Sequence, residues 1–186
     1  MANNHDIAAF DSLPPAERFS KRVILKVAEI TNVEVNPNGE FLYIITLNDG
    51  SDQSRTIVSS IVEFYKKEEL LGKHIVVVAN LKPANFRGVR SNGMLLAASD
   101  PSVTDKETCE VLFAPQYEPG TILEPEGFSA PEEELCYVKP EKFFEMPLHT
   151  VNGFVEIDGH KICQAGSSES ERKYLTAQVY KNGNVG

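Results

Sequence analysis

The alternation of apolar and polar positions predicts a β-rich first half. Apolar, β-branched runs bounded by turn residues indicate five strands, at residues 23–35, 41–47, 55–59, 74–79 and 94–98. Asn36-Pro37-Asn38-Gly39 separates the first two runs and is typical of a tight turn, in which Gly39 is free to adopt a positive φ. Between the third and fourth runs, the apolar spacing of residues 61–71 predicts a short helix ended by Gly72.

The second half has a different sequence pattern, because prolines divide it into short segments. Six of them fall at Pro115, Pro119, Pro125, Pro131, Pro140 and Pro147. Short strands are expected at residues 109–113 and 135–138. A hairpin is expected where residues 155–157 and 161–163 bracket Asp158-Gly159, a strong turn signal.

Three strands, a short helix and two more strands follow one another in an OB-fold, although another small antiparallel barrel or a sandwich would give a similar pattern. We therefore predict a mainly β fold: a five-stranded OB-fold barrel with a second, small, loop-rich β domain packed on it. The predicted segments are an N-terminal arm or linker at 1–21, the OB-fold domain at 22–105 and the accessory β domain at 106–186.

The charge distribution changes the first impression that composition gives. The chain has 186 residues and a formal charge of −9, which by itself argues against a nucleic-acid partner. However, residues 106–186 carry seven basic and fourteen acidic side chains, whereas residues 22–105 carry nine and ten. From Leu70 to Ser99 there is no Asp or Glu and there are four cations. A net charge can hide a local patch of opposite sign, although a solvated basic loop would look the same.

Other chemistry is sparse in the sequence. No run of about 18 apolar residues is present, and the first ten residues lack the basic and apolar regions of a secretory signal. Cys109, Cys136 and Cys163 form no C-x-x-C pair, and the four histidines are scattered. No nucleophile elbow, phosphate-binding glycine loop or H-E-x-x-H motif occurs. We expect a cytoplasmic protein with reduced thiols, no metal, no cofactor, no membrane partner and no catalytic activity.

The most informative stretch is residues 80–99, NLKPANFRGVRSNGMLLAAS. It is predicted to be a loop between two buried strands that carries Lys82, Arg87 and Arg90. Arginine offers a planar fork for phosphate or base edges, and lysine offers a point charge. Phe86 and Met94 are candidates either for stacking on bases or for packing in the core.

This stretch resembles the pattern N-L-x-P-x-x-(M/L)-R-G-x-x-S-x-(G/A)-M of the tRNA-binding domain family. Leu25-Lys26-Val27 is similar to the family's L-R-(V/I), and Arg55-Thr56-Ile57-Val58-Ser59 is similar to its R-T-V-V-S. The resemblance covers about residues 22–100. Residues 147–150 and 155–163 resemble, less closely, the extra C-terminal domain of the endothelial monocyte-activating polypeptide II-like members.

The resemblance implies a non-catalytic, largely sequence-independent tRNA-binding module that assists an aminoacyl-tRNA synthetase in cis or in trans. The implied partners are tRNA and a synthetase catalytic domain or complex, such as a methionyl-, lysyl- or tyrosyl-tRNA synthetase. In the resembling relatives the accessory domain imitates a dimer interface, so we expect a monomer. The candidate RNA-binding residues are Lys26, Arg55, Asn80, Lys82, Arg87, Arg90, Ser91 and Met94.

These candidates have different expected roles. The five cations would contact the RNA backbone. Asn80, Ser91 and Met94 would shape the loop or touch the RNA; the alternatives are loop-closing hydrogen bonds for the first two and core packing for Met94.

Departures from the family pattern favour weaker or differently oriented binding. Asn36 and Asn85 stand where the family has a histidine and usually a lysine, and Lys26 replaces an arginine. One alternative function is therefore a protein–protein scaffold domain of a multi-synthetase complex with weak RNA binding. Another is a cytokine-like released fragment, although residues 26–32, KVAEITN, agree poorly with the heptapeptide linked to that activity.

Overall fold

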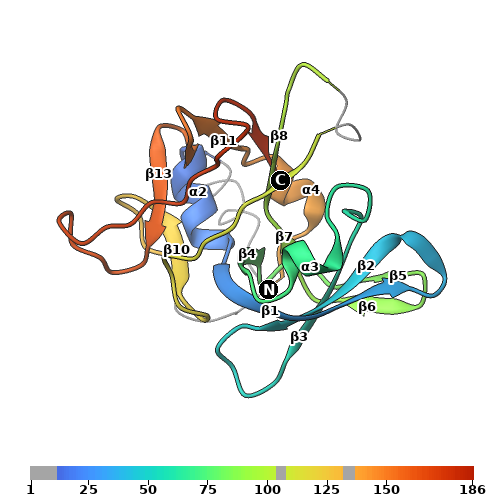
Figure 1. Cartoon of the computed structure of the whole chain (residues 1–186). Helices are drawn as coiled ribbons and strands as arrows, with labels where there is room; N and C mark the ends of the chain where they lie inside the picture. The colour runs from blue at the N-terminus through green and yellow to red at the C-terminus, as the bar shows by residue number, and fades with distance from the viewer. Residues whose placement is uncertain (1–11, 104–107, 132–136) are drawn as a thin grey trace.

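The computed structural model describes residues 12–103, 108–131 and 137–186. The chain enters through helix α2 (Pro15–Arg22), whose first turn accommodates a proline because the first N–H groups of a helix need no partner within it. Ala16 and Phe19 of this helix are buried. Part of the predicted N-terminal arm is thus a helix that packs beside β10 (Ile122–Pro125), as Figure 1 shows.

The first half contains the predicted succession of strands and helix. Its elements are β1 (Leu25–Asn36), β2 (Gly39–Asn48), β3 (Arg55–Ser59), α3 (Lys67–Leu70), β4 (His74–Val78), β5 (Ala84–Phe86), β6 (Val89–Ser91), β7 (Met94–Leu95) and β8 (Ala97–Ser99). The mainly β fold of OB type is confirmed. The predicted helix is shorter than expected, the fifth run is divided at Leu96, and the predicted loop contains the β5–β6 hairpin.

The turn between β1 and β2 differs in one detail from the prediction. Pro37 and Asn38 form the turn, and Asn36 pairs with Gly39 across it. The side-chain oxygen of Asn36 accepts a hydrogen bond from the Asn38 N–H at 2.9 Å. Gly39 is the first residue of β2 and does not have a positive φ, because the tighter two-residue turn leaves it in the strand.

The strands of both halves, except β5 and β6, join in one antiparallel sheet, and β5 and β6 form a separate two-stranded ribbon. The order is β3-β2-β1-β10-β13-β12-β11-β14-β8-β9, with β4 pairing with β1 and β7. The described strands do not close the predicted barrel by continuous pairing. β3 stands at one end of this strand order. On its free side, the Asn92 N–H, which follows β6, donates a backbone hydrogen bond of 2.8 Å to the Thr56 carbonyl of β3.

The second half is built from short strands and one short helix. After β10 its elements are α4 (Pro140–Phe144), β11 (Leu148–Val151), β12 (Phe154–Ile157), β13 (His160–Gln164) and β14 (Asn184–Val185), and β9 (Glu110–Val111) precedes them. The predicted hairpin is confirmed, with positive φ at Asp158 and Gly159 in its turn. Half of the strand predicted at 135–138 lies outside the described residues, and Val138 forms a parallel bridge with Leu81.

Two apolar clusters form the core. One fills the OB-type half, around Ile30, Ile45 and Ile75. The other joins residues from both halves, including Leu25 of β1 and Leu123 of β10. Because the two halves share this second cluster, the core does not mark a boundary between two domains. The predicted division near residue 105 therefore stays a prediction. Of the helices in the described segments, none has the length and apolar character that crossing a bilayer requires.

A buried carboxylate ties the C-terminal segment to β9. Glu110 accepts backbone hydrogen bonds from Gln178 at 2.7 Å, Val179 at 2.9 Å and Tyr180 at 3.0 Å. Backbone amides that converge on one carboxylate replace the water that it loses on burial. Glu110 therefore holds residues 178–180 against the sheet.

We expect Glu110→Gln to lower the free energy of unfolding by about 2 kcal/mol, because the amide replaces a charged acceptor and turns an N–H toward backbone donors. Urea unfolding followed by circular dichroism measures this loss. Glu118→Gln, at an exposed position of the same half, is the matched control and should change little. Equal stabilities of the two variants would contradict the tying role of Glu110.

Candidate nucleic-acid interface

The acid-free stretch from Leu70 to Ser99 contains a hairpin with two different faces. Asn85 pairs with Arg90, and Phe86 pairs with Val89, so the two pairs point to opposite sides of the β5–β6 ribbon. Arg87 and Gly88 form the turn with φ of 50° and 87°. A two-residue turn with positive φ at both positions matches the twist of the hairpin. The hairpin thus carries a cation at its tip, beside an aromatic ring.

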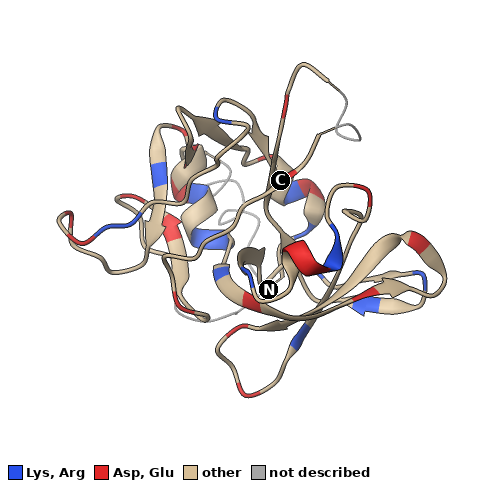
Figure 2. Ribbon diagram, in the orientation of Figure 1, with Lys and Arg blue, Asp and Glu red and all other residues tan. Residues whose placement is uncertain are grey.

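Three of the predicted cations are exposed around this hairpin. They are Lys82, Arg87 and Arg90. Within the described ranges, no hydrogen bond or ion pair engages the side chains of Lys82 and Arg87, and Arg90 makes one long contact of 3.4 Å to the Asn92 side-chain oxygen. Figure 2 shows basic positions on the β5–β6 hairpin, at the end of the molecule away from β10 and β13, with acidic positions on the neighbouring strands. Positive charge is therefore concentrated along the hairpin itself.

Asn36 fastens this hairpin to the turn between β1 and β2. Its side-chain amide, 2% exposed, donates to the carbonyl of Phe86 at 3.1 Å. A Cβ placed at Gly39 would lie 3.1 Å from Cγ of Arg87, so the stem of that arginine runs close to the turn. From the sequence, Asn36 is expected to begin a turn and is a departure from a family motif. The Asn-Pro-Asn-Gly turn indicated its local bond, but its partner 50 residues away could not be read from the sequence.

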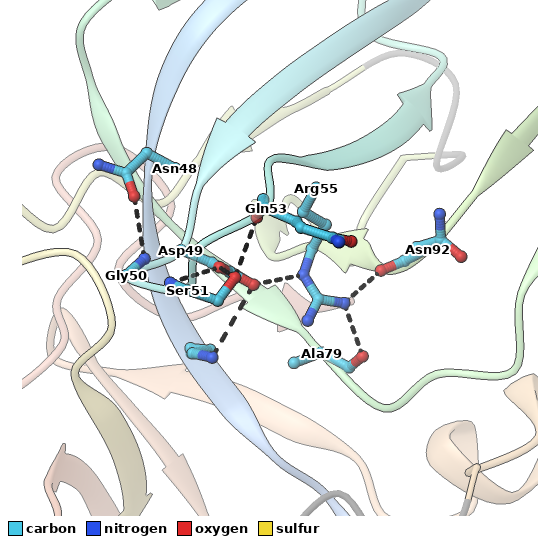
Figure 3. A network of polar contacts seen from close by, with 9 residues as sticks. Asn48, Asp49, Gly50, Ser51, Gln53, Arg55, Ala79 and Asn92 are labelled. Atoms are coloured by element: carbon cyan, nitrogen blue, oxygen red, sulfur yellow. Dashed lines mark hydrogen bonds and ion pairs between the residues drawn. The ribbon is translucent and has the colours of Figure 1, made fainter.

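Two other predicted cations surround a buried carboxylate, as Figure 3 shows for the arginine. Arg55 donates through Nε to Asp49 Oδ2 at 2.9 Å, and through Nη1 to the carbonyls of Ala79 and Asn92 at 2.9 and 2.7 Å. Lys26 Nζ lies 3.8 Å from the same carboxylate oxygen. The side chains of Arg55 and Lys26 are 14% and 20% exposed. This cluster joins β1, β3 and the segments that follow β2, β4 and β6.

The pKa of Asp49 reflects its surroundings. Burial alone would raise it, but hydrogen bonds from Ser51 and Arg55 and the charge of Lys26 outweigh burial and lower the pKa to about 2. The carboxylate is therefore charged throughout the physiological pH range and is paired with both cations. The cluster is a cross-link between strands at the base of the exposed loop.

The three neutral candidates lie below the surface or at its edge. Asn80 is buried, accepts from the Ile24 N–H at 2.9 Å and donates to the Arg22 carbonyl at 2.7 Å. Ser91 is buried, accepts from the Val58 N–H at 2.9 Å and donates to the Gly93 carbonyl at 3.0 Å. Met94 is half-buried and packs against the shared core cluster.

The eight candidates therefore occupy three kinds of position. Lys82, Arg87 and Arg90 face solvent, whereas Lys26 and Arg55 are largely covered. Asn80, Ser91 and Met94 hold the loop and its flanking strands together. Their roles in RNA binding stay predictions.

The described part of the chain contains no candidate site for a metal ion. No group of three or more His, Cys, Asp or Glu side chains there is arranged to hold an ion. Cys109 and Cys163 are free thiols, and Cys136 lies outside the described residues.

Comparison with known proteins gives a consistent result. Residues 25–121 match the family described as "Putative tRNA binding domain". The chain is 40% identical over 177 residues to a methionine–tRNA ligase of Treponema denticola, covering 90% of this chain and 22% of the ligase. It is 37% identical over 185 residues to a methionine–tRNA ligase of Borrelia hermsii, covering 98% and 25%.

The chain thus spans about a quarter of the length of these ligases. Among solved structures, it is similar to the C-terminal domain of Plasmodium vivax p43, with 26% identity and a TM-score of 0.74 over 91% of this chain and 99% of that one. The family match includes the whole candidate interface, from Lys26 to Met94. This chain belongs to the tRNA-binding domain family.

Proposed function

We propose that the chain binds the sugar–phosphate backbone of tRNA through the exposed cations of the β5–β6 hairpin and the adjoining loop. The observation that carries this proposal is the exposure of Lys82, Arg87 and Arg90 in a stretch that has no carboxylate. Exposed cations with few or weak polar contacts in the protein are available to phosphate, and contacts to phosphate position RNA without reading its sequence. In this proposal Lys26, Arg55, Asn80, Ser91 and Met94 support the loop.

The module carries out no chemistry of its own; it assists a synthetase, in cis or in trans. Its similarity to segments of methionine–tRNA ligases supports a ligase of that class as the partner. A tethered RNA-binding module raises the effective concentration of tRNA near the catalytic domain. Such a module belongs in the cytoplasm, where aminoacylation takes place.

The chain is expected to be a monomer, because its own second half pairs with strands of the OB-type half. Strands β9 and β10 of the second half pair with β8 and β1, so sheet edges of the OB-type half are covered within the same chain. A covered edge does not recruit a strand from a second copy.

A salt titration tests backbone binding. With three phosphate contacts, we expect the logarithm of the tRNA association constant to fall against the logarithm of the salt concentration with a slope of about −2 to −3. Fluorescence anisotropy of labelled tRNA over a range of KCl concentrations measures the slope. Absence of binding at low salt would overturn the proposal and favour a protein–protein scaffold.

A further inference from the structure

A groove lies beside the β5–β6 hairpin, where the OB-type half meets the C-terminal segment. Its volume is about 740 Å³, within the range of about 300–1,000 Å³ that is usual for ligand sites. The walls are mostly apolar and include Leu42, Phe64, Phe86, Met94, Phe144 and Leu148. Among the described residues that line it there is no Asp or Glu, although the chain as a whole is acidic.

The hairpin brings this groove next to the exposed cations. Phe86 is 43% exposed and lines the groove, whereas Asn85 and Arg90 lie on the opposite face of the ribbon. Arg87 follows Phe86 directly in the turn. One nucleotide could therefore reach both features, with its phosphate at Arg87 and its base against the ring of Phe86.

We propose that this groove takes an unpaired base of bound RNA, which stacks on Phe86 while Arg87 contacts the adjoining phosphate. This inference rests on the proposed function and names the part of the RNA that the chain selects: a single-stranded nucleotide. Proteins recognise unpaired RNA by combining aromatic platforms with a positively charged track.

Charge favours a nucleotide over a segment of protein as the occupant. Arg87 follows Phe86 directly in the turn, and no Asp or Glu side chain lies among the described residues that line the groove. Ser59, Ser60 and Asn184 add neutral groups at the edge of the groove that suit the polar edges of a base. A purely apolar peptide would use neither the cation nor these groups.

The experiment uses the absence of tryptophan from the chain. In Phe86→Trp the introduced indole is the sole tryptophan, and its fluorescence should be quenched when a base stacks on it. The probes are a six-nucleotide single-stranded RNA and the same oligomer made from abasic nucleotides, which keeps the phosphates and lacks the bases. Phe41→Trp is the matched control, because Phe41 is 55% exposed and does not line the groove.

We expect the intact oligomer, and not the abasic one, to quench Phe86→Trp, with little change in Phe41→Trp. Phe86→Ala should weaken binding of the intact oligomer about tenfold and leave binding of the abasic oligomer unchanged. Phe86→Leu keeps an apolar side chain without a ring, and it should likewise lose the preference for the intact oligomer over the abasic one. Thermal unfolding of each variant confirms that the fold is retained.

The failures of the two proposals are distinguishable. If tRNA binds while Phe86→Trp is not quenched and Phe86→Ala loses nothing, the base site is wrong, backbone binding stands, and a protein segment becomes the candidate occupant. If neither tRNA nor the oligomers bind the unchanged protein at low salt, both proposals are overturned.

Discussion

Replacing Asp49 with asparagine is expected to lower the free energy of unfolding by about 3 kcal/mol. The change leaves Arg55 and Lys26 largely covered without their common carboxylate. Removing one partner of a buried ion pair is costly because the remaining charge has lost its solvation and gains nothing in return. Urea unfolding measures the loss, with the exposed neighbour Asp52→Asn as the matched control. Similar stabilities of the two variants would show that the cluster does not cross-link the strands.

The same carboxylate predicts how stability depends on pH. Its pKa is lower in the folded chain, at about 2, than its ordinary value of 3.8. Such a group stabilises the fold above the ordinary pKa, and this contribution is lost as the pH falls through the folded pKa. The unchanged protein should therefore lose about 2 kcal/mol more than Asp49→Asn between roughly pH 4 and pH 2. Parallel stability curves for the two proteins over this interval would contradict the assignment.

Replacing Arg87 and Arg90 together with glutamine is expected to weaken tRNA binding about 50-fold at moderate salt. Both side chains are exposed, so the loss should come from the interface rather than from the fold. Losing two of three phosphate contacts should also reduce the steepness of the salt dependence by about 1.5 in the log–log slope. Fluorescence anisotropy at several salt concentrations gives both quantities.

The control for this double variant removes the same charge from another place. Lys173 and Lys181 are exposed cations of the second half. Lys173→Gln/Lys181→Gln changes the net charge equally, but it is expected to alter tRNA affinity by less than about threefold, because neither residue lies on the β5–β6 hairpin and long-range effects of exposed charges are screened by salt. If both double variants lose the same affinity, net charge and not the hairpin determines binding.

Local features of the sequence predicted the local features of the structure. Alternating apolar positions placed the long strands correctly, because one face of each strand must be buried. Asp158-Gly159 predicted a hairpin because few residues accept the positive φ that its turn requires. The acid-free stretch in the sequence contains Lys82, Arg87 and Arg90, and these three cations are exposed in the structure. Sequence also indicated the family, since its motifs occur in order along one segment.

Only the tertiary structure decided which candidates face solvent. Lys26 and Arg55 carry the same charge as Arg87, but Asp49 pairs with both, and two backbone carbonyls accept hydrogen bonds from Arg55. Exposure is a property of the neighbours in space, and those neighbours come from distant parts of the chain. Asn36 holds the carbonyl of Phe86, 50 residues away, for the same reason. The sequence by itself determined the strands, the turns and the family. Folding determined which cations stay exposed, because a buried carboxylate pairs with Lys26 and Arg55 and leaves them largely covered.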